Sequence, residues 1–168
     1  MKFSIRHRSE TVTIAVSNQL VVPCWHGPPT DEAIDALESI MDERFEREGR
    51  FVLCAIIDNT AFRKVADLPL SLRERFIKTT ELAETKSNLG VVVIKGEGFV
   101  AASLRMIIAS TFLVARVTKM KIKVAPTFDE AAGYIAPIIN EQTSNVIAAL
   151  DQSGAQLAPL KPTANAPM

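Results

Sequence analysis

Hydrophobic residues follow the spacing of strands and helices in turn along this chain. Residues 11–16 alternate between polar and apolar, and an apolar run over residues 20–24 follows a short polar turn, which predicts two strands. Apolar residues then recur at helical spacing over residues 33–45. Residues 51–57 are apolar without alternation, which is typical of a strand that is covered on both faces in a parallel sheet.

Capping and turn residues predict where the first two helices begin and end. Thr30 is a suitable N-cap for a helix with acidic residues in its first turn, and Gly49 is the expected stop. Residues 71–74 read Ser-Leu-Arg-Glu, which has the spacing of a capping box and predicts a second helix through about residue 86. Asn88 and Gly90 are expected to form the turn that ends it.

The same elements recur in the C-terminal half. Residues 91–94 predict a second buried strand, residues 99–116 an apolar helix, and residues 119–125 a half-exposed strand near a sheet edge. Thr127 begins another capping box, and a short last helix is expected over residues 142–150. The helix after Thr127 should turn a row of apolar side chains inward: Phe128, Ala131, Ala132, Ile135 and Ile138.

This order of elements predicts the fold class and the extent of the domain. Strands that alternate with helices form a mostly parallel sheet through right-handed crossovers. We therefore expect a single layered α/β domain with about five strands and four helices over residues 1–150. Residues 151–168 are rich in small and polar residues and prolines, and we expect a disordered tail there.

The element order over roughly residues 10–140 resembles the STAS domain superfamily, named after sulfate transporters and anti-sigma factor antagonists. In those domains the loop after the third strand carries Asp-Ser-Ser-Gly or Asp-x-Thr-Gly. Residues 57–62 of this chain read Ile-Asp-Asn-Thr-Ala-Phe. The apolar helix, short strand and acidic helix start of residues 99–139 are similar to the bacterial STAS-like branch that is grouped with lipid-transfer-type domains.

The resemblance implies a non-enzymatic regulatory domain, like an anti-sigma factor antagonist or a stress-signalling scaffold, that docks a protein partner. The partner-binding or phosphorylation candidates are Asp58, Asn59 and Thr60. In kinase-switched antagonists a hydroxyl residue directly follows the aspartate, whereas Asn59 stands there in this chain. Thr60 matches the scaffold branch, and Ala61 replaces the usual glycine. The alternative is that these side chains only satisfy backbone groups of a turn.

The apolar helix has a wider hydrophobic surface than packing on one sheet requires. A helix on a sheet needs an apolar stripe of about 100°, and residues 99–117 exceed it. The uncharged part is about half the roughly 20 residues of a membrane span. We expect a homodimer with this helix or its neighbours in the contact. The alternative function is an apolar-ligand or membrane-surface module. The candidate residues for the dimer contact and for this alternative function are the same: Phe99, Met106, Phe112 and Leu113.

Composition excludes several other functions. Nineteen Lys and Arg balance nineteen Asp and Glu, so no basic field favours nucleic acid. Only two cysteines and two histidines are present, and no set of metal ligands, acid, base and nucleophile can be named, so we expect no metal, no cofactor and no catalysis. Cys24 and His26 could share a face but lack an orienting third group. With no secretory leader recognised, a cytoplasmic location is expected.

Overall fold

The computed structural model describes residues 1–58, 69–95 and 121–155, and these form one sheet with helices on both faces. The sheet has six strands in the order β1-β2-β3-β4-β5-β6, so every strand lies beside its neighbour in sequence. β2 runs antiparallel to its neighbours β1 and β3, and β3 to β6 run parallel. The predicted α/β class with a mostly parallel sheet is confirmed. The strands are β1 (Ser4–Arg8), β2 (Val12–Ser17), β3 (Leu20–Trp25), β4 (Phe51–Asp58), β5 (Ser87–Lys95) and β6 (Lys121–Ala125).

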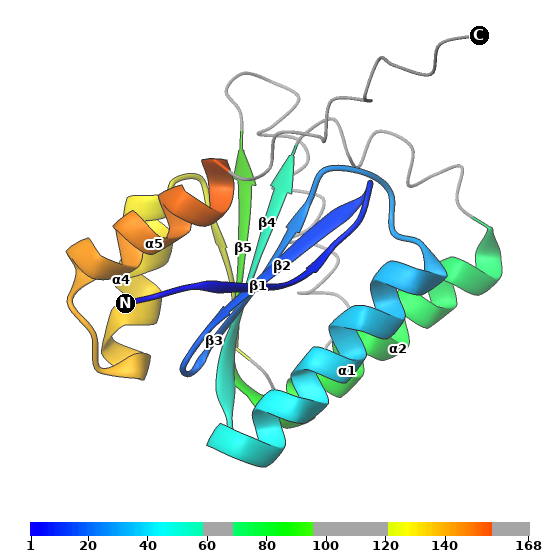
Figure 1. The fold of residues 1–168 in the computed structure, drawn as a ribbon, viewed down its shortest axis with the longest axis horizontal. Coiled ribbons are helices and arrows are strands. Elements are labelled where there is room, and N and C mark those ends of the chain that lie inside the picture. Colours follow the sequence, from blue (N-terminus) through cyan, green and yellow to red (C-terminus); the bar gives the residue numbers. More distant parts are fainter. Residues whose placement is uncertain (59–68, 96–120, 156–168) are drawn as a thin grey trace, which may run out of the picture.

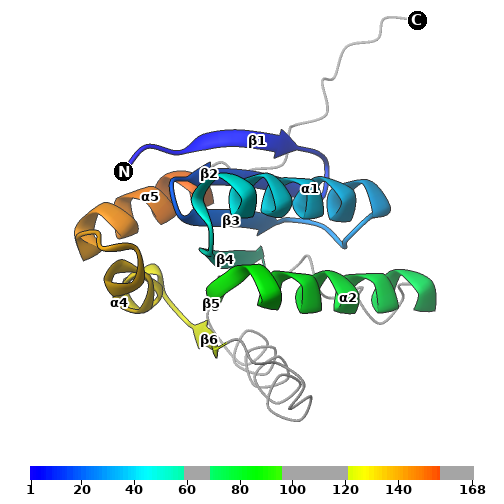
Figure 2. The same ribbon diagram turned by 90° about the horizontal axis from the view of Figure 1, so that it is seen from below.

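Four helices in the described residues cover the sheet. α1 (Asp31–Glu48) connects β3 to β4, and α2 (Leu70–Lys86) precedes β5. α4 (Phe128–Ile139) and α5 (Thr143–Ala155) follow β6. Figure 2 shows α1 and α2 on one face and α4 and α5 on the other. Right-handed crossovers that advance in one direction place their helices on the same face, which explains the shared face of α1 and α2.

Alternate residues of the strands supply two separate hydrophobic cores. The strand residues that point toward α4 and α5 include Val22, Cys24, Cys54 and Ile56. Those that point toward α1 and α2 include Val21 and Trp25 of β3 and Phe51 and Ile57 of β4. Both sides of β4 are therefore buried, as its uninterrupted apolar sequence predicts.

The first strand, β1, is the element that the hydrophobic pattern does not predict. Its five residues include one aliphatic side chain, Ile5, which is 43% exposed. The strand is held by backbone pairing to β2, with an irregular register between Ile5 and His7. Arg6 forms an ion pair of 2.6 Å with Glu43 of α1. Charged side chains and a bulge on an edge strand protect it from pairing with other chains.

Two of the three predicted helix caps are present. Thr30 Oγ1 accepts a hydrogen bond of 3.2 Å from the Ala33 N–H, and Thr127 accepts one from the Glu130 N–H. Gly49 ends α1 with a φ of 74°, a value that glycine adopts without strain. The capping box at Ser71 is wrong, because α2 begins one residue earlier and its N-cap, Pro69, makes no side-chain bond. Ser71 therefore lies inside the first turn.

The predicted turn between α2 and the next strand is also wrong. Asn88 and Gly90 lie within β5, which starts at Ser87. Ser87 ends the helix, since its N–H bonds to the Ala83 carbonyl and its hydroxyl donates to the same oxygen at 2.6 Å. Its extended backbone then enters the sheet opposite Phe51, so no separate turn is needed.

The last two helices differ from the prediction in detail. Ile138 is 47% exposed, while Ala136 takes the inward place, because residues 131, 132, 135 and 136 form the stripe that faces the sheet. α5 extends to Ala155, five residues beyond the predicted domain boundary. Buried Val146, Leu150 and Ser153 continue its packing stripe at helical spacing, so residues 151–155 belong to the domain. The remaining residues 156–168 of the expected tail lie outside the described part of the chain.

Substitutions at Thr30 and Ser71 test the predicted starts of α1 and α2. Thr30→Ala removes the cap of α1 and should lower the free energy of unfolding by about 1 kcal/mol. Ser71→Ala removes no cap bond and places a better helix former in the first turn of α2, so it should leave stability unchanged or slightly raised. Urea denaturation of both variants measures the difference. Equal losses would show that Ser71 caps α2 after all.

Candidate functional site

Asp58 lies at the carboxyl end of the parallel strands, as the sequence predicts. It is the last residue of β4, and its Cα partner is Lys95, the last residue of β5. The side chain is half-buried. Ligands and partners of open α/β sheets usually bind at this edge. Asn59 and Thr60, the other two candidates of the loop, lie outside the described residues.

Trp25 supports this edge from the side of α1 and α2. It pairs with Ile57 at the end of β3 and is only 2% exposed. It belongs to the hydrophobic cluster that includes α1 residues, and its ring also meets Phe76 of α2 edge-on, with centroids 5.7 Å apart. This contact fixes α2 next to the strand end that carries Asp58.

Ion pairs hold the exposed sides of α1 and α2 together. Arg75 of α2 bonds to Asp31 and Asp35 of α1, and these hydrogen bonds raise the pKa of the guanidinium. At the C-terminal end of α2, Lys86 forms an ion pair with Asp42 of α1. The acidic residues of α1 thus serve helix pairing, and in the described part of the chain no three potential ligands are grouped to hold a metal.

Cys24 and His26 bond to different parts of the molecule. The Cys24 thiol donates to the Ser153 carbonyl of α5 at 3.8 Å. His26 Nε2 lies 3.2 Å from the Ser9 carbonyl oxygen, in the turn between β1 and β2. Thr11 of the same turn accepts from the backbone N–H of Gly27, where a Cβ would approach Thr11 Cγ2 to 3.0 Å. His26 therefore lies where the chain after β3 contacts the turn between β1 and β2.

Cys54 is a fully buried residue of β4. Burial raises the pKa of its thiol, and the neighbouring Cys24 raises it further. Neither cysteine forms a disulfide, and both lie in the core between the sheet and α4 and α5. Cys54 therefore acts as a small apolar residue of the core.

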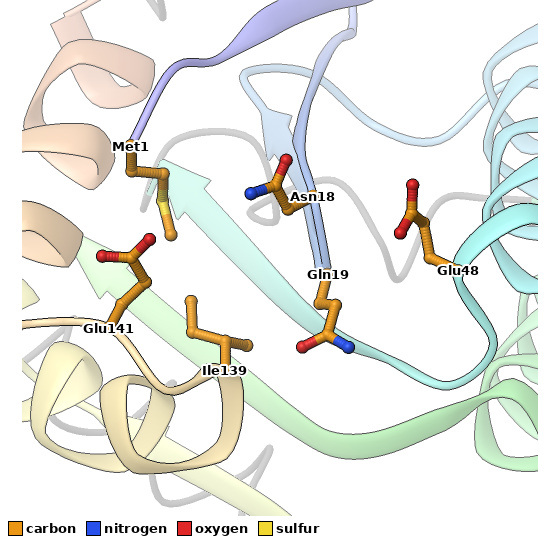
Figure 3. A pocket seen from close by; sticks show the side chains of 6 residues that line it. All are labelled: Met1, Asn18, Gln19, Glu48, Ile139 and Glu141. Carbon is orange, nitrogen blue, oxygen red and sulfur yellow. The ribbon is translucent and has the colours of Figure 1, made fainter.

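A cavity that the sequence does not predict lies at the opposite edge of the sheet. Its volume is about 220 Å³, and Figure 3 shows Asn18 and Gln19 between Glu48 on one side and Glu141 on the other. Met1 and Ile139 complete the lining. Asn18 and Gln19 precede β3 and Glu48 ends α1 before β4, so parallel pairing places them at one edge. Ile139 ends α4 and Glu141 lies between α4 and α5, and no pattern in the sequence predicts that this corner meets the same edge.

The interface candidates of the apolar helix, Phe99, Met106, Phe112 and Leu113, lie outside the described residues. None of the described helices is long and apolar enough to cross a bilayer. Comparisons of the chain with protein-family models, curated proteins and solved structures gave no significant match.

The raised pKa of Cys54 predicts a pH dependence of stability. Its ordinary value is 9.0, so above this pH the unfolded chain loses a proton that the folded chain retains. The contribution of this group to the free energy of unfolding should be constant below this range and should fall as pH rises above it, by up to about 1.4 kcal/mol per pH unit.

Urea denaturation of the wild type and of Cys54→Ala, from about pH 7 to pH 10, separates this group from other titrating residues. The variant should be less stable at neutral pH because it leaves a cavity, but its stability should fall less steeply above pH 9. Parallel curves would contradict the assignment.

Proposed function

We propose that this protein is a non-enzymatic regulatory domain that binds a protein partner through the loop starting at Asp58. The observation that carries the proposal is the position of this carboxylate. It ends an interior strand of the sheet and lies between the ends of β3 and β5. A loop on such a rigid platform presents its residues in a reproducible geometry, which favours recognition.

The elements around Asp58 support a docking role. The Trp25 and Phe76 contact holds the start of α2 near the end of β3, and Pro69 leads the chain into that helix. The loop therefore leaves the sheet at Asp58, the end of β4, and returns at Pro69, directly before α2. The likeness of residues 57–62 to the STAS loop adds to this, since that loop is where those domains meet their partners.

A phosphate on Thr60 would change the charge of this surface. It would add about −1.5 to −2 charges close to Asp58. An acidic partner surface would then be repelled, whereas an arginine-rich surface would be attracted. The proposed mechanism is therefore docking that phosphorylation can switch.

The docking surface is tested by affinity capture and crosslinking from a lysate with wild type, Asp58→Ala and Thr60→Glu as baits. We expect both variants to lose the specific partner by about ten-fold or more, the loss typical of an interface anchor. Glu48→Ala is the control, because it removes an exposed carboxylate at the opposite edge. If all four baits capture the same partner equally, the loop is not the docking site.

We further propose that the protein works in the cytoplasm as a homodimer. Two buried thiols that form no disulfide support a reducing compartment. On α2, Leu70 and Ile77 lie two helical turns apart and are 70% and 58% exposed. Apolar side chains that remain exposed on one helix face support an interface in that region.

Sedimentation velocity at micromolar concentration tests the dimer. The wild type should sediment at twice the 18.4 kDa chain mass, and Ile77→Glu should shift the equilibrium toward monomer. Ile138→Glu changes an exposed isoleucine on α4 and should leave the dimer intact. A wild type that sediments as a monomer would overturn the proposal.

A further inference from the structure

The last turn of α5 covers Cys24. Figure 1 shows α5 beside α4, with its end near the arrowheads of the parallel strands. Ser153 and Gly154 of this turn are buried, and the Ser153 carbonyl accepts from the Cys24 thiol. Cys24 itself is completely buried. Access to its sulfur therefore depends on whether this turn stays docked.

Two buried hydroxyls, one in this turn and one opposite Cys24 in the sheet, have no hydrogen-bond partner in the described residues. One is Ser153 Oγ, and the other is Oγ1 of Thr13, the cross-strand neighbour of Cys24. Both residues are more than nine-tenths buried. A buried hydroxyl without a partner destabilises the closed state, because water would satisfy it once the turn opens.

The helix end has little stability of its own. α5 has no acidic residue in its first turn and no basic residue in its last turn. Asp151 lies near the C-terminal end, where the helix dipole disfavours a negative charge. Ser153 and Gly154 are weak helix formers. α1, by contrast, has Thr30 as its N-cap, Gly49 as its C-cap and Arg47 in its last turn.

We propose that the last turn of α5, residues 151–155, is a latch that opens locally and exposes the Cys24 thiol to small soft electrophiles. Cys54 lies one strand further into the sheet, in the core that α4 also covers. It reacts only when the whole domain unfolds. Cys24 is thus a cryptic modification site, and this inference does not depend on docking at Asp58.

The experiment compares the alkylation of the two cysteines by N-ethylmaleimide in the native protein. The thiolate sulfur adds to the maleimide double bond and a solvent proton completes the neighbouring carbon, so each event adds one intact reagent. Peptide mapping by mass spectrometry gives a separate rate for each cysteine in the same wild-type sample. We expect Cys24 to react at least about ten-fold faster than Cys54.

The urea dependence of labelling separates local opening from global unfolding. Labelling of Cys24 should change little at low urea, because opening one helical turn exposes little surface. Labelling of Cys54 should follow the urea dependence of global unfolding measured on the same protein. Equal rates with equal urea dependence would overturn the proposal, since the turn would then open only with the domain.

Three variants test the cause of the opening. Asp151→Lys changes an exposed residue so that its charge suits the helix end, and it should slow Cys24 labelling about two- to five-fold. Glu46→Lys makes the same change near the end of α1 and should leave the Cys24 rate unchanged. Thr13→Val removes an unpartnered hydroxyl and should slow labelling by about five-fold or more. If either Asp151→Lys or Thr13→Val fails to slow the labelling of Cys24, the latch is contradicted.

Discussion

The burial of β4 on both faces is the constraint on which the rest of the structure depends. Its residues from Phe51 to Ile57 contain no charged side chain, so the strand can lie only where apolar elements cover it on both sides. α1 and α2 cover one side and α4 and α5 the other. The first charged residue after this run is Asp58, at the carboxyl end of the strand. The position of the candidate site thus follows from the length of the buried strand.

The pairing of α1 with α2 combines an apolar contact with charge complementarity. Acidic residues of α1 face Arg75 and Lys86 of α2 across the exposed side of the pair. Exposed ion pairs add little to stability. Most of the stability of this helix layer therefore comes from its apolar packing on the sheet, which includes the contact of Phe76 with Trp25 of β3. The charges favour one register of the two helices over others, because a shift would bring like charges together. This register determines where α2 begins and hence where the loop after Asp58 must return.

The sequence predicts those parts of the fold whose signals are local. The buried strands, the caps Thr30 and Thr127 and the position of Asp58 follow from runs and spacings of a few residues. β1 could not be predicted, because backbone pairing with β2 and the ion pair of Arg6 with Glu43 hold it, and neither leaves a hydrophobic pattern. The turn expected at Asn88 and Gly90 is overridden by pairing in the sheet. The cavity near Glu48 and Glu141 joins segments far apart in sequence, so only the tertiary structure reveals it.

The two faces of the carboxyl edge are held by different means. On the side of α1 and α2, Trp25 is buried against an aromatic ring and both helices are tied by ion pairs. On the opposite side, Cys24 lies under the end of a helix that lacks favourable terminal charges and leaves hydroxyls without partners. Local opening requires the least free energy where packing is poorest and polar groups gain water. Motion at this edge should therefore begin at α5, while the side of α2 keeps Asp58 in place.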